Sequence, residues 1–196
     1  MLERWHCWSG FSTTPLQANL KMGKQPLPVA SICRPMNCGN RWQKKGNAEA
    51  QFSIGFLYDY GWGLPRDFAA AAQWYLRAAK QGHAEAQLSI GFMYNNGMGV
   101  AEDLVEAVKW YRLAAEQGIS GGQSALGMMH ESGRGLPKDH VRAYMWFEIS
   151  IHDDSVARVK KKVEHRRDEL AKSMTPAQVA EAKRLAREWL AKHSQE

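Results

Sequence analysis

The sequence predicts an all-α protein, a right-handed α/α solenoid of three 36-residue helix-turn-helix repeats followed by C-terminal capping helices. The first observation behind this prediction is an internal repeat, because residues 46–51, 82–87 and 118–123 align without gaps. The second is a pair of glycines at the same place in every unit, and the third is apolar spacing of helical period on both sides of that pair. A fixed period of this length is typical of stacked repeats.

Three regions follow from the repeat boundaries. Residues 1–45 precede the repeats, the repeats occupy residues 46–81, 82–117 and 118–151, and residues 152–196 form the capping helices. The 196 residues, 44% of them hydrophobic and 23% charged, suit a globular protein with a buried core. The net charge of +6 comes from the two flanking regions rather than from the repeats, so it is not read as a nucleic-acid signal.

The N-terminal region is expected to be irregular, mobile and dispensable for folding. No helical or strand period survives its prolines, which are Pro15, Pro26, Pro28 and Pro35. The region lacks the apolar core of a secretory signal and the sequence lacks a membrane span, so a cytoplasmic location is favoured. Cys33 and Cys38 could form a disulfide, but free thiols are the favoured interpretation for three cysteines without metal-ligand spacing.

Each repeat begins with a helix, which in the first copy is expected over residues 48–60. A glycine-containing turn ends it, and a second helix follows from about Asp67 to Gln81. Asp67 and its equivalents Asp103 and Asp139 stand where a side-chain oxygen can cap the second helix. The turn glycines, which allow backbone conformations that a Cβ forbids, are Gly61, Gly63, Gly97, Gly99, Gly133 and Gly135.

Apolar spacing predicts the packed faces of both helices. Small residues alternate with large rings on the second helix, and the large residues are Trp74, Tyr75, Trp110, Tyr111 and Trp146. Glycine inside a helix costs about 1 kcal/mol relative to alanine, so its recurrence implies close approach of another helix. These helix-interior glycines are Gly55, Gly91 and Gly127. Replacing Trp110 by alanine is expected to cost about 3–5 kcal/mol as a large-to-small core change.

The pattern A-E-A-Q-x-x-I-G-x-x-Y-x-x-G-x-G-x-x-x-D, then A-x-x-W-Y-x-x-A-A-x-x-G, resembles the Sel-1-like repeat family of bacterial type, a relative of the tetratricopeptide repeat. The resemblance covers Gly46 to Ile151. The third copy departs from it, with His130 in place of tyrosine and Ser150 in place of alanine. Many relatives are exported. Some members of a cysteine-rich branch of the family bind β-lactams, but the repeats here contain no cysteine, so that activity is not carried over.

Two helices are expected after the repeats. The first carries Val156, Val159, Val163 and Leu170 on one side and a run of basic residues on the other. Thr175-Pro176-Ala177-Gln178 is a start signal for the second, because threonine caps, proline suits the first turn and Gln178 can complete a capping box. A similar tail closes many bacterial proteins with these repeats, and here it is expected to cover the third repeat.

No catalytic, metal-binding or cofactor-binding signature occurs in the sequence, so a non-enzymatic protein without cofactor or metal is predicted. The glycine pairs follow helices rather than strands and are explained by the repeat turn. His130 and Glu131 could form an acid–base pair. A core histidine is the favoured interpretation, because His130 occupies the position of Tyr58 and Tyr94.

A second stripe on the first helices carries the functional prediction. Related solenoids bind partners in a groove lined by these helices, and aromatic side chains mixed with amides and carboxylates suit a protein or peptide partner. The candidate binding residues are Phe56, Asp59, Tyr60, Phe92, Asn95, Asn96, Met128 and Glu131. The alternative is that Phe56, Phe92 and Met128 pack between repeats. Other functions considered are an enzyme-like binder of small molecules of β-lactam type, and a nucleic-acid or membrane-surface binder acting through the basic tails; nucleic acid is not expected as a partner.

Overall fold

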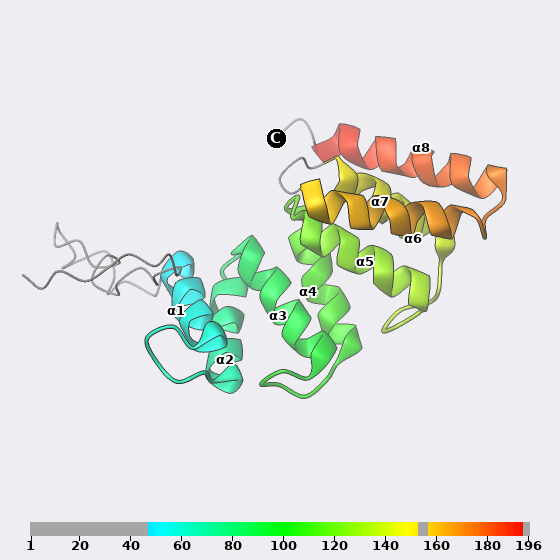
Figure 1. Cartoon of the computed structure of the whole chain (residues 1–196). Coiled ribbons are helices and arrows are strands. Elements are labelled where there is room, and N and C mark those ends of the chain that lie inside the picture. The colour runs from blue at the N-terminus through cyan, green and yellow to red at the C-terminus, as the bar shows by residue number, and fades with distance from the viewer. Residues whose placement is uncertain (1–46, 153–156, 194–196) are drawn as a thin grey trace, which may run out of the picture. The chain divides into compact units, whose positions relative to one another are not determined.

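The computed structural model describes residues 47–152 and 157–193. The predictions for residues 1–45, including the cysteine pairing, and for the side chains of Val156 and Val159 lie outside these residues. The described part contains helices and no strand, and the paired helices of the repeats follow one another along the chain (Figure 1). The helices are α1 (Ala48–Tyr60), α2 (Phe68–Ala79), α3 (Ala84–Asn96), α4 (Leu104–Glu116), α5 (Ser120–Ser132), α6 (His140–Ile151), α7 (Ala157–Ala171) and α8 (Pro176–His193).

The second helices begin where the aspartates predict. Asp67 and Asp103 each accept hydrogen bonds from two backbone N–H groups of the first turn, at 2.9 and 3.0 Å, and Asp139 accepts one at 3.0 Å. The first helices end at glycines in the left-handed conformation. Gly97, for example, has a φ of 65° and closes α3 by donating its N–H to the Met93 carbonyl. The bounds of α1 agree with the expected helix over residues 48–60.

The helix-interior glycines allow the two helices of each repeat to pack closely, as predicted. A Cβ placed on Gly91 would lie 2.8 Å from the ring of Tyr111, closer than carbon atoms approach in proteins. Gly55 faces Tyr75 and Gly127 faces Phe147 in the same way. The rings of Tyr75, Tyr111 and Phe147 therefore occupy the space that a side chain on the first helix would need.

The tryptophans of the second helices are less uniform than the spacing predicts. Trp146 is buried, whereas Trp74 and Trp110 are half-buried at the edge of the packed face. The aromatic residue that follows each tryptophan is the one that reaches the interior, because it lies against the glycine of the facing helix. The Nε1 donor of Trp110 is buried without a hydrogen-bond partner.

Glutamines bridge the two helices of a repeat and also join neighbouring repeats, contacts that the sequence did not predict. Gln81 donates through Nε2 to Gln51 Oε1 at 2.7 Å, and Gln117 donates in the same way to Gln87 Oε1 at 2.6 Å. Gln87 in turn donates to the Ala79 carbonyl at 3.2 Å. Each pair links the first helix of a repeat to the residue that ends the same repeat, and the bond from Gln87 to Ala79 joins the second repeat to the first.

Helices α7 and α8 both pack against α6. Leu170 of α7 and Ala182 of α8 are buried in one cluster with residues of α6, while Trp189 meets Trp146 edge-on with ring centroids 5.7 Å apart. The predicted capping box starts α8, since Thr175 N donates to Gln178 Oε1 at 2.9 Å and Gln178 N donates to Thr175 Oγ1 at 3.3 Å. The two C-terminal helices therefore cover the apolar surface of the third repeat.

Candidate functional site

Large apolar side chains remain exposed along the first helices of the repeats. Phe92 of α3 is 52% exposed and Met128 of α5 is 40% exposed, and these residues occupy equivalent positions. Tyr60, at the end of α1, is 56% exposed and Trp62, in the following turn, is 48% exposed. We call these four residues the apolar stripe. Only two other large apolar residues of the described chain are comparably exposed, Val105 and Leu113, and both lie on α4.

Aromatic rings form a cluster at the first-repeat end of the apolar stripe. Phe56 contacts Tyr60 and Trp62, with ring centroids 4.3 and 5.2 Å apart, and Tyr60 and Trp62 are 5.7 Å apart. Their packing is possible because Gly61 turns the backbone back on itself through a φ of 69°. Trp62 was missed by the sequence analysis. The sequence did contain a signal for it, because a bulky aromatic residue stands between two turn glycines where the other repeats have Met98 and Arg134.

The predicted second stripe, whose spacing also includes Phe52 and Leu88, divides into two rows in the structure. Phe52 stacks on His83 of the next repeat, with ring centroids 4.6 Å apart. Leu88 packs against Gly121 of the next repeat so closely that a Cβ on this glycine would lie 2.7 Å from the leucine side chain. These two residues pack between repeats, although the spacing places them off the packed face. Phe92 and Met128, one turn further along their helices, stay exposed.

Some of the polar residues predicted to bind a partner already make hydrogen bonds within the protein. Asp59 Oδ2 accepts a hydrogen bond from the Tyr75 hydroxyl at 3.3 Å, and burial together with this carboxylate raises the pKa of Tyr75. Burial alone raises the pKa of Tyr111, the equivalent residue, to about 12. Asn96 donates to the Phe92 carbonyl at 2.8 Å. Asn95 is half-buried beside these residues.

Glu131 of α5 occupies the position of Asp59 and contacts α7. Its Oε2 accepts a hydrogen bond from Arg166 Nε at 2.6 Å. The structure therefore does not pair Glu131 with His130, which is buried at the position of Tyr94 and has no hydrogen-bond partner at Nδ1. Burial lowers the pKa of His130, and the carboxylate of Asp139 partly opposes this effect. The geometry supports a neutral core histidine.

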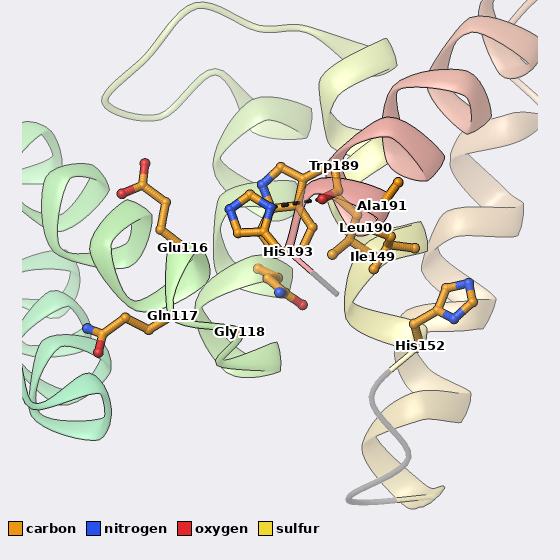
Figure 2. A pocket seen from close by; sticks show the side chains of 10 residues that line it. Glu116, Gln117, Gly118, Ile149, His152, Trp189, Leu190, Ala191 and His193 are labelled. Atoms are coloured by element: carbon orange, nitrogen blue, oxygen red, sulfur yellow. Dashed lines mark hydrogen bonds between the residues drawn. The ribbon is translucent and has the colours of Figure 1, made fainter. Parts of the chain in front are cut away.

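A pocket of about 610 Å³ opens where the end of α8 meets the ends of α4 and α6. In Figure 2, Glu116, Gln117 and Gly118 lie on one side and Ile149 and Leu190 on the other. The ring of His193 lines the pocket and stacks on Trp189, with ring centroids 3.9 Å apart, and its Nδ1 contacts the Trp189 carbonyl at 2.8 Å. Sequence reasoning could not find this pocket, because it depends on how α8 docks.

The described residues contain no group of three or more histidine, cysteine, aspartate and glutamate side chains that could hold a metal ion. No helix in the described ranges has the length and hydropathy needed to cross a membrane.

The family model of the Sel1 repeat matches residues 48–83, 84–119 and 120–154, which together make up more than half of the chain. The chain belongs to the Sel1 repeat family. Sel1 repeat proteins generally mediate protein–protein interactions, and the family resemblance and the all-α repeat fold predicted from the sequence are confirmed.

Solved structures of Sel1 repeat proteins are similar to this chain. A Sel1 repeat protein from Oxalobacter formigenes is 42% identical with a TM-score of 0.53, over 55% of this chain and 45% of that one. The protein c5321, a protective antigen of uropathogenic Escherichia coli strains with an SLR fold, is 31% identical with a TM-score of 0.68, over 76% of this chain and 31% of that one. The chain thus spans less than half the length of either protein. No curated protein matches it.

Proposed function

We propose that this protein is a non-enzymatic scaffold or adaptor that holds a peptide or protein segment in a groove lined by the first helices of its repeats. The observation that carries the proposal is the apolar stripe. Four of the six exposed large apolar residues in the described part of the chain lie on these helices or in the turn after α1. Exposed apolar residues gathered in one place are typical of interaction surfaces.

The composition of the stripe also supports a protein partner. Tyrosine, tryptophan, phenylalanine and methionine are enriched in protein interfaces, where they supply large contact areas. Tyr60 and Trp62 are held in place by Phe56, so little side-chain freedom is lost when a partner covers them. Asn95 and Asn96 follow Phe92 by one helical turn, and they would supply polar contacts at its edge.

The test compares two double variants of the full chain. Phe92→Ala with Met128→Ala removes the central part of the stripe, and Val105→Ala with Leu113→Ala removes side chains of similar exposure from α4. Partners are captured from a lysate of the source organism, identified by mass spectrometry, and their affinity is then measured with purified proteins.

The stripe variant is expected to weaken binding by at least tenfold, because central interface residues dominate affinity. The α4 variant should bind like the unaltered protein. A partner that binds both variants equally well would refute the assignment of the stripe, provided that circular dichroism shows both variants to be folded.

The basic C-terminal helices give less support to a nucleic-acid or membrane-surface role. Arg166 pairs with Glu131, Arg167 with Glu148, and Arg184 with two carboxylates of its own helix. These ion pairs engage three of the arginines with which the helices could contact a phosphate backbone. A flat response of any such binding to salt would count against this alternative.

A further inference from the structure

The space between α4 and α6 differs chemically from the equivalent space between α2 and α4. Where the first junction has Leu76, Tyr94 and Glu106, the second has Arg112, His130 and Arg142. An apolar residue, a phenol and a carboxylate are thus replaced by two guanidinium groups and an imidazole. The repeat itself requires none of these replacements, because the first junction packs without them.

The second junction contains a pocket of about 390 Å³. Its apolar wall consists of Leu126, Met145, Trp146 and Trp189, the last of which α8 contributes. Arg112 and Arg142 line the same pocket, and Glu116 is the only carboxylate among its lining residues. The lining therefore carries one net positive charge beside two indole rings.

His130 forms part of this lining and is 94% buried, since only 6% of it is exposed. Its Nδ1 is a buried polar atom without a hydrogen-bond partner, which costs free energy in a folded protein. The charged groups that face His130 are Arg112 from α4, and Asp139 and Arg142 from α6 and its cap. One nitrogen of this imidazole is unpartnered, and beside it lie Arg112 and Arg142, whose Nε pairs with Asp139 Oδ2 at 3.4 Å. A bound anion would stabilise this arrangement.

We propose that this pocket binds a small aromatic monocarboxylate, with its carboxylate between Arg112 and Arg142 and its ring against Trp146 and Trp189. Arginine binds carboxylates through two parallel hydrogen bonds, and indole rings favour edge-on or offset contact with a second aromatic ring. Glu116 disfavours a second negative charge on the ligand. No residue of the apolar stripe takes part, so this site is separate from the proposed partner-binding surface.

Benzoate is the probe, titrated into the full chain by calorimetry, with neutral benzamide as its matched control. Saturable binding is expected with a Kd of about 0.1 mM, a normal affinity for a ligand of this size. Benzamide should bind at least tenfold more weakly because it lacks the charge. Failure of benzoate to saturate up to 10 mM, roughly a hundredfold above that Kd, would overturn the proposal, as would equal binding of benzamide.

Arg112→Leu tests the site itself, because leucine is the residue that the first junction carries at this position. The variant should fold normally and bind benzoate at least tenfold more weakly. Arg77→Leu, which removes an exposed guanidinium from α2, should leave binding unchanged. Unchanged binding in Arg112→Leu would place benzoate elsewhere and refute the site.

Nuclear magnetic resonance gives a readout that does not depend on affinity. Bound benzoate should raise the pKa of His130, because the carboxylate stabilises the imidazolium form.

A second ligand, acetyl-Gly-Gly-Phe, tests whether the aromatic carboxylate is a free small molecule or the C-terminus of a peptide. If this peptide binds more tightly than benzoate, the ligand is assigned to a peptide C-terminus, and if it binds more weakly, to a free molecule. Both results depend on binding at the proposed pocket.

Discussion

Arg166 of α7 donates a hydrogen bond to Glu131 of α5 at 2.6 Å, and this contact replaces one that lies inside the first repeat. There the equivalent carboxylate, Asp59, accepts from the hydroxyl of Tyr75. The third repeat has Phe147 instead of a tyrosine, so its carboxylate has no hydroxyl to accept from and turns to α7. A single change from tyrosine to phenylalanine thus coincides with the attachment of the C-terminal helices.

The ion pair between Arg166 and Glu131 is expected to contribute less to stability than the apolar contact of the same helix. Arg166→Gln should lower the free energy of unfolding by less than about 1 kcal/mol, because both side chains are partly exposed. Leu170→Ala should lower it by about 2–4 kcal/mol, because Leu170 is buried. Urea denaturation measures both, and equal losses would show that the charge, not the core, holds α7.

Gly91→Ala should be strongly destabilising although alanine favours helices. The new methyl group would overlap the ring of Tyr111, which is itself buried, so a loss of about 1–3 kcal/mol is expected. Gly121→Ala is the matched control in the next repeat, since its methyl group would meet only the flexible end of Leu88. This control should be neutral or stabilising by up to about 1 kcal/mol. A thermal melt of each variant decides, and similar losses would contradict the packing described for Gly91.

Trp110 is half-buried, and its indole donor is buried without a partner. Trp110→Ala should therefore cost about 3 kcal/mol, at the lower end of the range for large aromatic residues. Trp110→Phe should stay within about 1 kcal/mol of the unaltered protein, because losing contact area is offset by removing the unpaired donor. Chemical denaturation of both variants tests this, and a loss in Trp110→Phe as large as in Trp110→Ala would show that the indole nitrogen finds a partner.

His130 should make stability depend on pH on the acid side of neutrality. Burial lowers its pKa in the folded protein below the ordinary value of 6.5, so the unfolded chain binds the proton more tightly. The stabilisation from a neutral His130 is complete above pH 6.5 and declines as pH falls from there towards the lowered pKa, by at most about 1.4 kcal/mol per pH unit.

The His130→Tyr variant has the tyrosine that the second repeat carries at this position, Tyr94, and a tyrosine does not titrate between pH 5 and 7.5. The difference in unfolding free energy between the two proteins, measured from pH 7.5 to 5, isolates His130 from the other six histidines. Identical pH profiles would show that His130 is protonated in the folded protein as readily as in the unfolded one.

Much of the fold could be predicted because it depends on contacts near in sequence. The bounds of α1, the caps at Asp67, Asp103 and Asp139, and the capping box at Thr175 follow from residues within one helical turn. The close approach at Gly91 followed from the recurrence of a costly glycine. In each of these cases the chemistry of one or two neighbouring residues was enough.

The candidate surface was predicted less completely, because it depends on which repeat lies against which. Phe52 and Phe56 are one turn apart on α1, yet Phe52 packs on His83 of the next repeat while Phe56 supports the exposed rings of Tyr60 and Trp62. Glu131 shares its position with Asp59, but its partner Arg166 comes from a helix outside the repeats. Helical spacing alone distinguishes none of these environments.

The glutamine contacts between neighbouring repeats have a consequence for how the chain folds. Within the repeats, each helix packs mainly on the helices next to it in sequence, and the glutamine bonds from Gln87 to Ala79 and from Gln123 to Ala115 join adjacent units only. Order therefore spreads along the chain from one unit to the next, with low contact order and rapid folding. The first repeat has a described neighbour on one side only, so its amide protons should exchange with solvent before those of the central repeat.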